Sequence, residues 1–144
     1  MTKSKSNTHF LIAEDDEVDI LALKRILIEI DQDIAFSIAH DGNEALAKLR
    51  ENAARGKEKE RMIVLLDLNM PRMNGHEFLD TLRADPAISD TQVFVLSTST
   101  HPSDVSASYK KHVAGYIPKD RLDAESFRQL FDSYLRMTAF PEDD

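Results

Sequence analysis

The sequence predicts a doubly wound α/β fold, in which one five-stranded parallel sheet carries five helices on its two faces. Two observations support this prediction. Five short apolar segments alternate along the chain with five longer segments of helical periodicity. Three of the apolar segments contain no polar residue, which is typical of strands covered on both faces. Such alternation is expected of a sheet whose strands are joined by right-handed helical crossovers.

The apolar segments are the expected strands, because each is short and bounded by polar residues. They lie at residues 10–13, 34–39, 62–66, 93–96 and 113–117. The helices are expected between them, at residues 17–30, 43–54, 75–84, 102–111 and 123–137. Asp41 is well placed to cap the second helix. The fifth helix has the clearest apolar stripe, whereas the fourth has little to bury and is the weakest of the five.

Length and composition bound the class of protein. The 144 residues correspond to about one domain, which we expect at residues 9–138, between a flexible tail at 1–8 and a C-terminal tail at 139–144. The 26 acidic residues outnumber the 18 basic ones, and the net charge of −8 disfavours nucleic acid as a partner. The absence of cysteine excludes disulfides, thiolate zinc sites and a cysteine nucleophile.

No part of the sequence suggests a membrane segment. No apolar run approaches the roughly 20 residues of a membrane span, and the basic start of the chain lacks the apolar core of a signal peptide. We therefore expect no membrane association and a cytoplasmic location. Residues 50–61 are strongly charged and are expected to form a solvated helix end and loop.

The candidate site residues follow four of the five expected strands. Glu14 and Asp15 follow the first, Asp67 and Asn69 the third, Ser97 the fourth and Lys119 the fifth. In a doubly wound sheet, ligands bind beyond the carboxyl ends of the strands, so these side chains should meet there.

Such a set of side chains suits phosphoryl chemistry. Converging carboxylates repel one another, and a divalent cation such as Mg²⁺ relieves that repulsion. A lysine and a hydroxyl can bind phosphoryl oxygens. An aspartate between a metal and a lysine is a plausible nucleophile that would form an acyl phosphate. Taken singly, each residue is more often a helix cap or a solvated surface group, so the prediction depends on their occurring together.

The motifs resemble the receiver domain of two-component response regulators, over nearly the whole chain from about Thr8 to Met137. The stretch LLDLNMP followed by MNG is the most specific. The segments that carry the resemblance are Leu11–Asp16 (LIAEDD), Val64–Pro71 (VLLDLNMP), Met73–Gly75 (MNG), Val95–Ser97 (VLS) and Gly115–Lys119 (GYIPK). The resemblance implies the flavodoxin-like receiver fold and a stand-alone, single-domain regulator. The motifs are also similar to those of regulators paired with phytochrome-type kinases.

The resemblance also implies roles for individual residues. Asp67 would accept a phosphoryl group from a phosphohistidine on a sensor kinase or phosphotransfer protein. Glu14, Asp15, Asp67 and the backbone carbonyl of Asn69 would hold Mg²⁺. Ser97 and Lys119 would bind the phosphoryl group, and Tyr116 would be the aromatic switch residue. Gly75 would permit the turn into the third helix.

One departure from the family pattern concerns Lys119. The family usually has proline directly after this lysine, with a cis bond between the two, whereas here Asp120 follows and Pro118 precedes. A cis bond without proline costs about 2.5–4 kcal/mol. We therefore expect a trans bond and a loop of different shape around Lys119.

The output would come from the receiver's own surface. We expect the 98–117 face to change shape on phosphorylation, with the weak fourth helix as part of it. A homodimer through the C-terminal helix, with Met137 and Phe140, is one option, and simple packing of that helix on the sheet is the other. The downstream target is unknown.

Two other functions remain as alternatives to the phosphoacceptor. A pseudo-receiver would act only as a protein-interaction module, although all acceptor and metal residues are present. An aspartate-nucleophile phosphatase would need a second aspartate two residues after the nucleophile, where this chain has Asn69. We therefore expect a signalling protein that contributes to its own phosphorylation and dephosphorylation, rather than an enzyme acting on other substrates.

Overall fold

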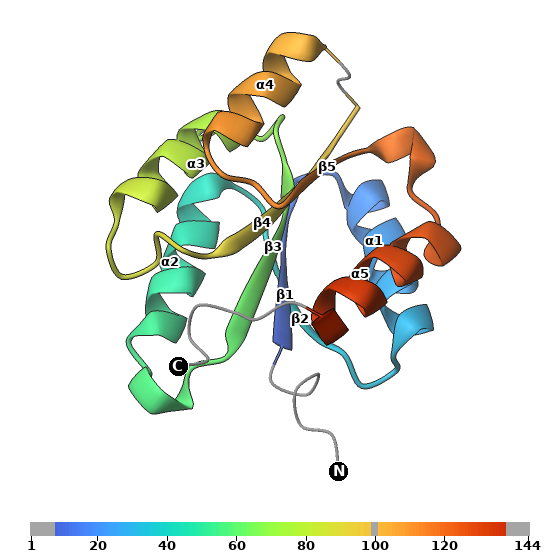
Figure 1. Cartoon of the computed structure of the whole chain (residues 1–144). Coiled ribbons are helices and arrows are strands. Elements are labelled where there is room, and N and C mark those ends of the chain that lie inside the picture. Colours follow the sequence, from blue (N-terminus) through green and yellow to red (C-terminus); the bar gives the residue numbers. More distant parts are fainter. Residues whose placement is uncertain (1–7, 99–100, 138–144) are drawn as a thin grey trace.

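The chain forms one parallel five-stranded sheet with helices on both sides (Figure 1). The computed structural model describes residues 8–98 and 101–137. The sheet has the order β2-β1-β3-β4-β5, and every pairing in it is parallel. Its strands are β1 (Thr8–Ala13), β2 (Ala35–Ala39), β3 (Arg61–Asp67), β4 (Gln92–Ser97) and β5 (Gly115–Pro118).

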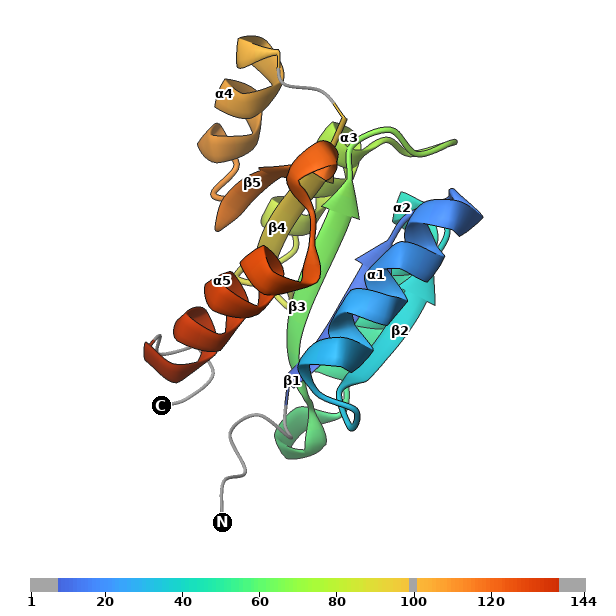
Figure 2. The same ribbon diagram turned by 90° about the vertical axis from the view of Figure 1, so that its right-hand side faces the viewer.

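Helices α1 and α5 cover one face of the sheet, and α2, α3 and α4 lie on the other (Figure 2). Their bounds are α1 (Glu17–Ile30), α2 (Gly42–Ala53), α3 (Gly75–Ala84), α4 (Pro102–Lys110) and α5 (Ala124–Met137), with short 3-10 turns η2 (Gly56–Glu58) and η3 (Lys119–Arg121). Successive residues of each strand supply the two cores in turn. In β1, Leu11 faces α2 and α3, whereas Phe10 and Ile12 face α1 and α5.

The structure confirms the fold class and all five expected strands and helices. Thr8, which we expected in the N-terminal tail, is the first residue of β1. Residues 1–7 and 138–144 lie outside the described residues, so the two tails stay predictions. The turns η2 and η3 were not expected, and η2 falls within the charged segment 50–61, at the end of the sheet away from the carboxyl ends of the strands.

Side-chain caps begin three of the helices just after the strands end. Asp16 accepts a hydrogen bond from the backbone N–H of Val18 at the start of α1. Asp41 accepts from Glu44 at the start of α2, which confirms the expected cap. In α3, Asn74 and Glu77 form a reciprocal capping box. These caps fix the direction in which the chain leaves the carboxyl edge of the sheet.

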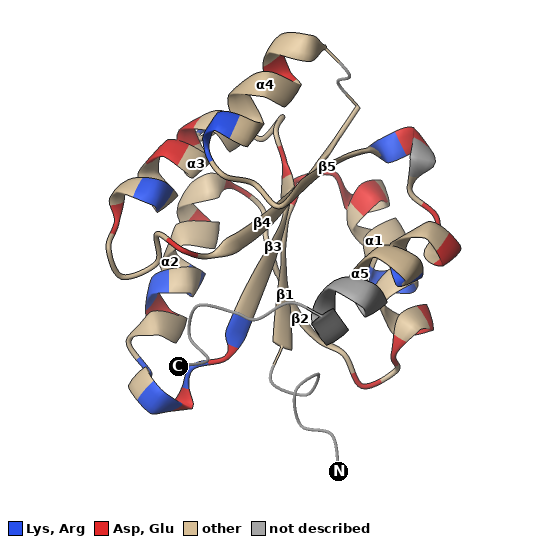
Figure 3. Ribbon diagram, viewed as in Figure 1, with Lys and Arg blue, Asp and Glu red and all other residues tan. Residues whose placement is uncertain are grey.

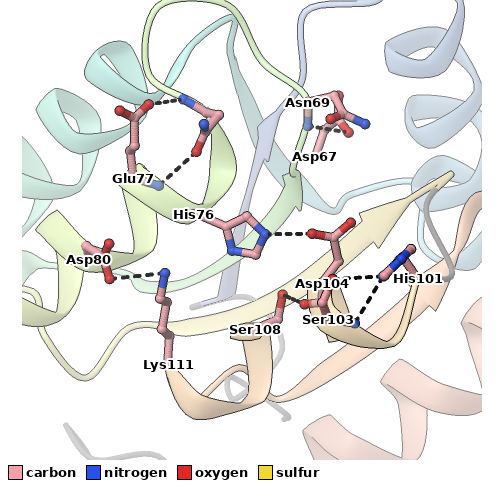
Figure 4. Close-up of polar contacts among 11 residues, drawn as sticks. Asp67, Asn69, His76, Glu77, Asp80, His101, Ser103, Asp104, Ser108 and Lys111 are labelled. Atoms are coloured by element: carbon pink, nitrogen blue, oxygen red, sulfur yellow. Dashed lines mark hydrogen bonds and ion pairs between the residues drawn. The ribbon is translucent and has the colours of Figure 1, made fainter. Parts of the chain in front are cut away.

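Helix α4 is attached mainly by polar contacts, as its composition predicts. Ser108 is the one buried residue of the helix, and its hydroxyl donates to the carbonyl of Asp104 at 2.8 Å. His76 of α3 contacts Asp104 at 3.3 Å, and Lys111, just after α4, contacts Asp80 of α3 at 3.2 Å (Figure 4). A helix held by few apolar contacts has low local stability.

Arg83 joins the C-terminal end of α3 to two loops. Its guanidinium donates to the carbonyls of Ser89 and Thr91 at 2.8 Å, of Lys111 at 2.9 Å and of His112 at 3.0 Å. The side chain is partly buried, and a guanidinium in that position can satisfy several carbonyls at once. It therefore ties the chain before β4 to the chain before β5.

Replacing Arg83 should destabilise the fold. We expect Arg83→Met to lower the free energy of unfolding by about 2 kcal/mol, because four carbonyls lose a charged hydrogen-bond donor. Urea denaturation followed by circular dichroism measures the loss. Arg50→Met is the matched control, since Arg50 is half exposed and its side chain has one polar partner among the described residues, Asp85 at 2.8 Å. Equal losses in the two variants would contradict the role given to Arg83.

Candidate functional site

Three carboxylates meet at the carboxyl edge of the sheet. Glu14 and Asp15 follow β1, and Asp67 ends β3, the strand next to it. Each offers an oxygen atom that lies within 4.8 Å of the other two. Glu14 and Asp67 are buried, with 2% and 5% of their surfaces exposed, whereas Asp15 is exposed. Figure 3 shows acidic residues at this edge, where the first strand leads into α1.

Backbone hydrogen bonds hold the acidic side chains in place. The N–H of Glu14 donates to the carbonyl of Ala39 at 2.9 Å, which extends the pairing of β1 with β2 by one residue. The N–H of Asp16 donates to Oε2 of Glu14 at 3.2 Å, and the N–H of Asn69 donates to Oδ1 of Asp67 at 3.2 Å (Figure 4). The loops that carry the carboxylates therefore also orient them.

The loop between β3 and α3 returns closely past Asp67. The N–H of Gly75 donates to the carbonyl of Leu68 at 2.9 Å. A Cβ atom at Gly75 would lie 2.6 Å from Cα of Leu68 and 3.1 Å from the carbonyl oxygen of Asp67. Gly75 thus permits the turn into α3, as expected, through the close approach of two backbone segments rather than through a positive φ.

Arg72 fixes the outer part of the same loop. It has a positive φ of 65°, an uncommon conformation for a residue with a side chain. Its Nη1 donates to Oδ2 of Asp41 at 2.7 Å. The pKa of Asp41 is lowered, first by the hydrogen bond from the Glu44 N–H and further by Arg72.

Lys119 reaches the carboxylates from the end of β5, the edge strand of the sheet. It lies in η3, directly after β5, and its Nζ atom is 2.7 Å from Oε1 of Glu14 and 3.6 Å from Oδ1 of Asp67. It also lies 2.8 Å from Oδ2 of Asp19, in the first turn of α1. One ammonium group is thus shared by three carboxylates.

Burial and charge shift the pKa values of the central ion pair. Burial raises the pKa of Glu14 to about 7, and the hydrogen bond from Lys119 only partly opposes it. Burial alone would lower the pKa of Lys119, but its hydrogen bonds to Asp19 and Glu14 and the charge of Asp67 outweigh that effect and raise it above the usual value. The lysine is therefore cationic across the physiological range.

The donor set fits a small divalent cation. Mg²⁺ is bound by a few carboxylate oxygens together with water and phosphate oxygens, and Glu14, Asp15 and Asp67 supply such oxygens within reach of one ion. Burial, and to a lesser extent the nearby charge of Asp67, raises the pKa of Glu14, and a bound cation would oppose both effects. The residues present thus match the ion that the sequence predicts.

The two remaining predicted residues, Ser97 and Tyr116, lie in the neighbouring strands β4 and β5. Ser97 ends β4 and is fully buried, next to β3 in the sheet. Tyr116 lies in β5, is partly buried, and packs against the core cluster under α2 and α3. The structure therefore brings Glu14, Asp67 and Lys119 into contact, and it places Ser97 at the same edge of the sheet.

Comparison with known proteins decides the family. The model for the "Response regulator receiver domain" matches residues 10–132. The chain belongs to the response regulator receiver family. Response regulator Rcp1 of Synechocystis sp. is 32% identical to this receiver over 120 residues, which are 83% of this chain and 82% of Rcp1.

Solved structures show the same fold. The phosphorylated cyanobacterial phytochrome response regulator RcpA superposes on this receiver with a TM-score of 0.75 at 28% identity, covering 93% of this chain and 98% of RcpA. A two-component response regulator from Legionella pneumophila gives 0.75 at 37% identity, covering 91% and 99%. The Mn²⁺-bound form of Rcp1 gives 0.72 at 30% identity, covering 92% and 98%. These relatives are matched over nearly their whole length, as expected for a single-domain response regulator with phytochrome-associated relatives.

Sequence reasoning missed Asp19. The residue stands one helical turn after Asp15, and that spacing places a further acid at the same edge of the sheet. The expected trans bond between Lys119 and Asp120 is confirmed, since the described residues contain no cis peptide bond.

The raised pKa of Glu14 predicts pH-dependent metal binding. Below about pH 7 this carboxyl holds a proton that a cation must displace. We expect Mg²⁺ affinity to rise about tenfold per pH unit below 7, with uptake of one proton by the buffer per ion, and to level off above 7. Calorimetric titrations in two buffers of different ionisation enthalpy measure both quantities. Glu14→Gln should remove the pH dependence, and a flat wild-type profile between pH 5.5 and 7 would contradict the assignment.

Proposed function

We propose that this receiver accepts a phosphoryl group onto Asp67 from a phosphohistidine of a sensor kinase or phosphotransfer protein, in a Mg²⁺-dependent reaction. The observation that carries the proposal is the place of Asp67, which lies close to the carboxylates of Glu14 and Asp15 and 3.6 Å from the ammonium of Lys119. The similarity to Rcp1 and RcpA supports a phytochrome-type kinase as the donor.

Each residue of the site has a separate role in the proposed reaction. A carboxylate oxygen of Asp67 attacks the phosphorus atom while the bond from phosphorus to the histidine nitrogen breaks. The Lys119 ammonium and the Ser97 hydroxyl bind oxygens of the incoming group and offset its charge. A cation held by Glu14, Asp15, Asp67 and the Asn69 carbonyl supplies further charge neutralisation when it is bound.

The signal leaves through the last part of the sheet. A phosphoryl group adds nearly two negative charges at Asp67 and draws Ser97 towards it. The space near Ser97 then admits the ring of Tyr116, and the 98–117 face changes shape. The weak attachment of α4, through Ser108 and contacts to His76 and Asp80, supports its role as the responsive element. Residues 99–100 of this face lie outside the described residues.

The kinase partner would approach over α1. Val18 and Leu21 in the first two turns are 75% and 48% exposed, and they lie beside the acidic edge. Large exposed apolar side chains beside a reactive site favour a protein partner. We infer no role for nucleic acid or membranes and a cytoplasmic location. Among the described residues, no helix is long and apolar enough to span a bilayer.

The homodimer stays a prediction. The sequence suggested a dimer surface that includes Met137 and Phe140. Phe140 lies outside the described residues, and so does the side chain of Met137. In the described part of α5, Phe127 and Phe131 are buried against the sheet, where Phe131 contacts Phe10 and Phe94. In this part of the helix, Leu130, which is 39% exposed, is the large apolar side chain that a partner could cover. The pseudo-receiver and the phosphatase also stay as alternatives, of which the phosphatase lacks its second aspartate.

Phosphorylation at Asp67 can be tested directly. We expect incubation with Mg²⁺ and acetyl phosphate to add the mass of one phosphoryl group to the intact protein. Asp67→Asn should abolish the adduct, because the amide is a poor nucleophile, and chelation of Mg²⁺ should suppress it in the wild type. An adduct that survives in Asp67→Asn, or none in the wild type, would contradict the proposal and favour the pseudo-receiver.

Hydrogen exchange tests the output face. With beryllofluoride as the phosphoryl mimic and Mg²⁺, amide protection within residues 101–117 should change, whereas protection in β1 and β3 should stay constant. The physical reason is the shallow burial of α4 compared with the fully covered central strands. Unchanged protection in α4 and β5, despite bound mimic, would remove this face from the signalling route.

A further inference from the structure

Asp19 competes with the acceptor for Lys119. The Nζ atom of Lys119 lies 2.8 Å from Oδ2 of Asp19, but 3.6 Å from Oδ1 of Asp67. Its contact with Glu14 is 2.7 Å. The ammonium therefore has two hydrogen-bonded carboxylates, and the acceptor aspartate is the most distant of its three anionic neighbours.

We propose that Asp19 is a positioning residue that holds Lys119 back from Asp67 until a phosphoryl group arrives. The inference rests on the proposed function, because it concerns the lysine that would bind the phosphoryl oxygens. Asp19 would thereby set how readily the receiver enters the phosphorylated state. Lys119 exchanges the Asp19 carboxylate for a phosphoryl oxygen and keeps its contact with Glu14.

The difference in burial decides which partner Lys119 releases. Glu14 is 2% exposed, and leaving a buried carboxylate without its counter-charge is strongly unfavourable. The Asp19 side chain is 37% exposed, so water can replace the lysine at little cost. The Lys119 side chain is itself 14% exposed, and its ammonium thus needs an anionic partner at every stage.

The structure also leaves space for the exchange. A cavity of about 90 Å³ lies beside the Asp19–Lys119 pair, between α1 and η3. Its walls are largely apolar and include Leu23, Ile26, Leu96 and Leu122. Lys119 itself lines this cavity, so its side chain has free space on the side of Asp19 in which to move.

Two charge-neutralising variants in the same helical turn test the proposal. We expect Asp19→Asn to be phosphorylated by acetyl phosphate about fivefold faster than the wild type, and to bind beryllofluoride about fivefold more tightly, the upper end for a partly exposed ion pair. Glu17→Gln removes the same charge, but Glu17 is 80% exposed and its contact within the described part of the chain is with His40 at 3.5 Å, so its rate should match the wild type. Asp19→Glu keeps the carboxylate and should restore a slower rate.

A double-mutant cycle shows whether Asp19 acts through Lys119. In a Lys119→Met background, Asp19→Asn should have no effect on beryllofluoride affinity. An equal gain with and without the lysine would assign the effect to general electrostatics and overturn the proposal. So would an Asp19→Asn rate equal to or below that of the wild type. A wild type that takes no phosphoryl group at all would instead refute the proposed function, so the two failures are distinguishable.

Discussion

The ion pair between Lys119 and Glu14 is the contact on which the site depends. It joins the end of β5 to the end of β1, although β3 and β4 lie between these strands in the sheet. The bridge therefore crosses above the end of β3, where Asp67 lies. Because Glu14 is buried and its pKa is raised to about 7 by that burial, the lysine is its main compensation. Removal of Lys119 would leave Glu14 buried without its main counter-charge, whereas removal of Glu14 would leave the lysine its contact with Asp19.

The surroundings of this pair differ sharply in rigidity. Asp67 ends β3 and Glu14 follows β1, two largely buried strands, and backbone N–H groups of Asn69 and Asp16 fix their carboxylates. By contrast, α4 buries a single serine, and the contacts that join it and the following Lys111 to α3 are partly exposed to solvent. A charge added at Asp67 therefore cannot be accommodated by moving the central strands. In the proposed function the response passes to β5 and α4, because weak attachment lowers the free energy needed to rearrange α4.

Much of this arrangement could be predicted from the sequence, because it follows from periodicity. The apolar runs and helical stripes predicted every strand and helix, and the residues directly after the strands predicted Glu14, Asp67 and Lys119 at one edge. Asp19 was missed because its role depends on a contact with a residue 100 positions away. The reason for Gly75 was missed because a close approach between Gly75 and Leu68 is tertiary, and no local pattern reports it.

The trans Lys119–Asp120 bond bears on how the lysine is aimed. Related receivers are expected to use proline after this lysine, whose ring restricts the backbone. Here the lysine lies in η3, and the N–H of Leu122 donates to the carbonyl of Lys119 at 3.2 Å. The turn restrains the backbone weakly, so the direction of the side chain depends on the anions around it. Glu14 cannot release its partner and Asp19 can, and the position of the ammonium is therefore set by competition among carboxylates. A phosphoryl group on Asp67, with nearly two negative charges, is the strongest competitor of all.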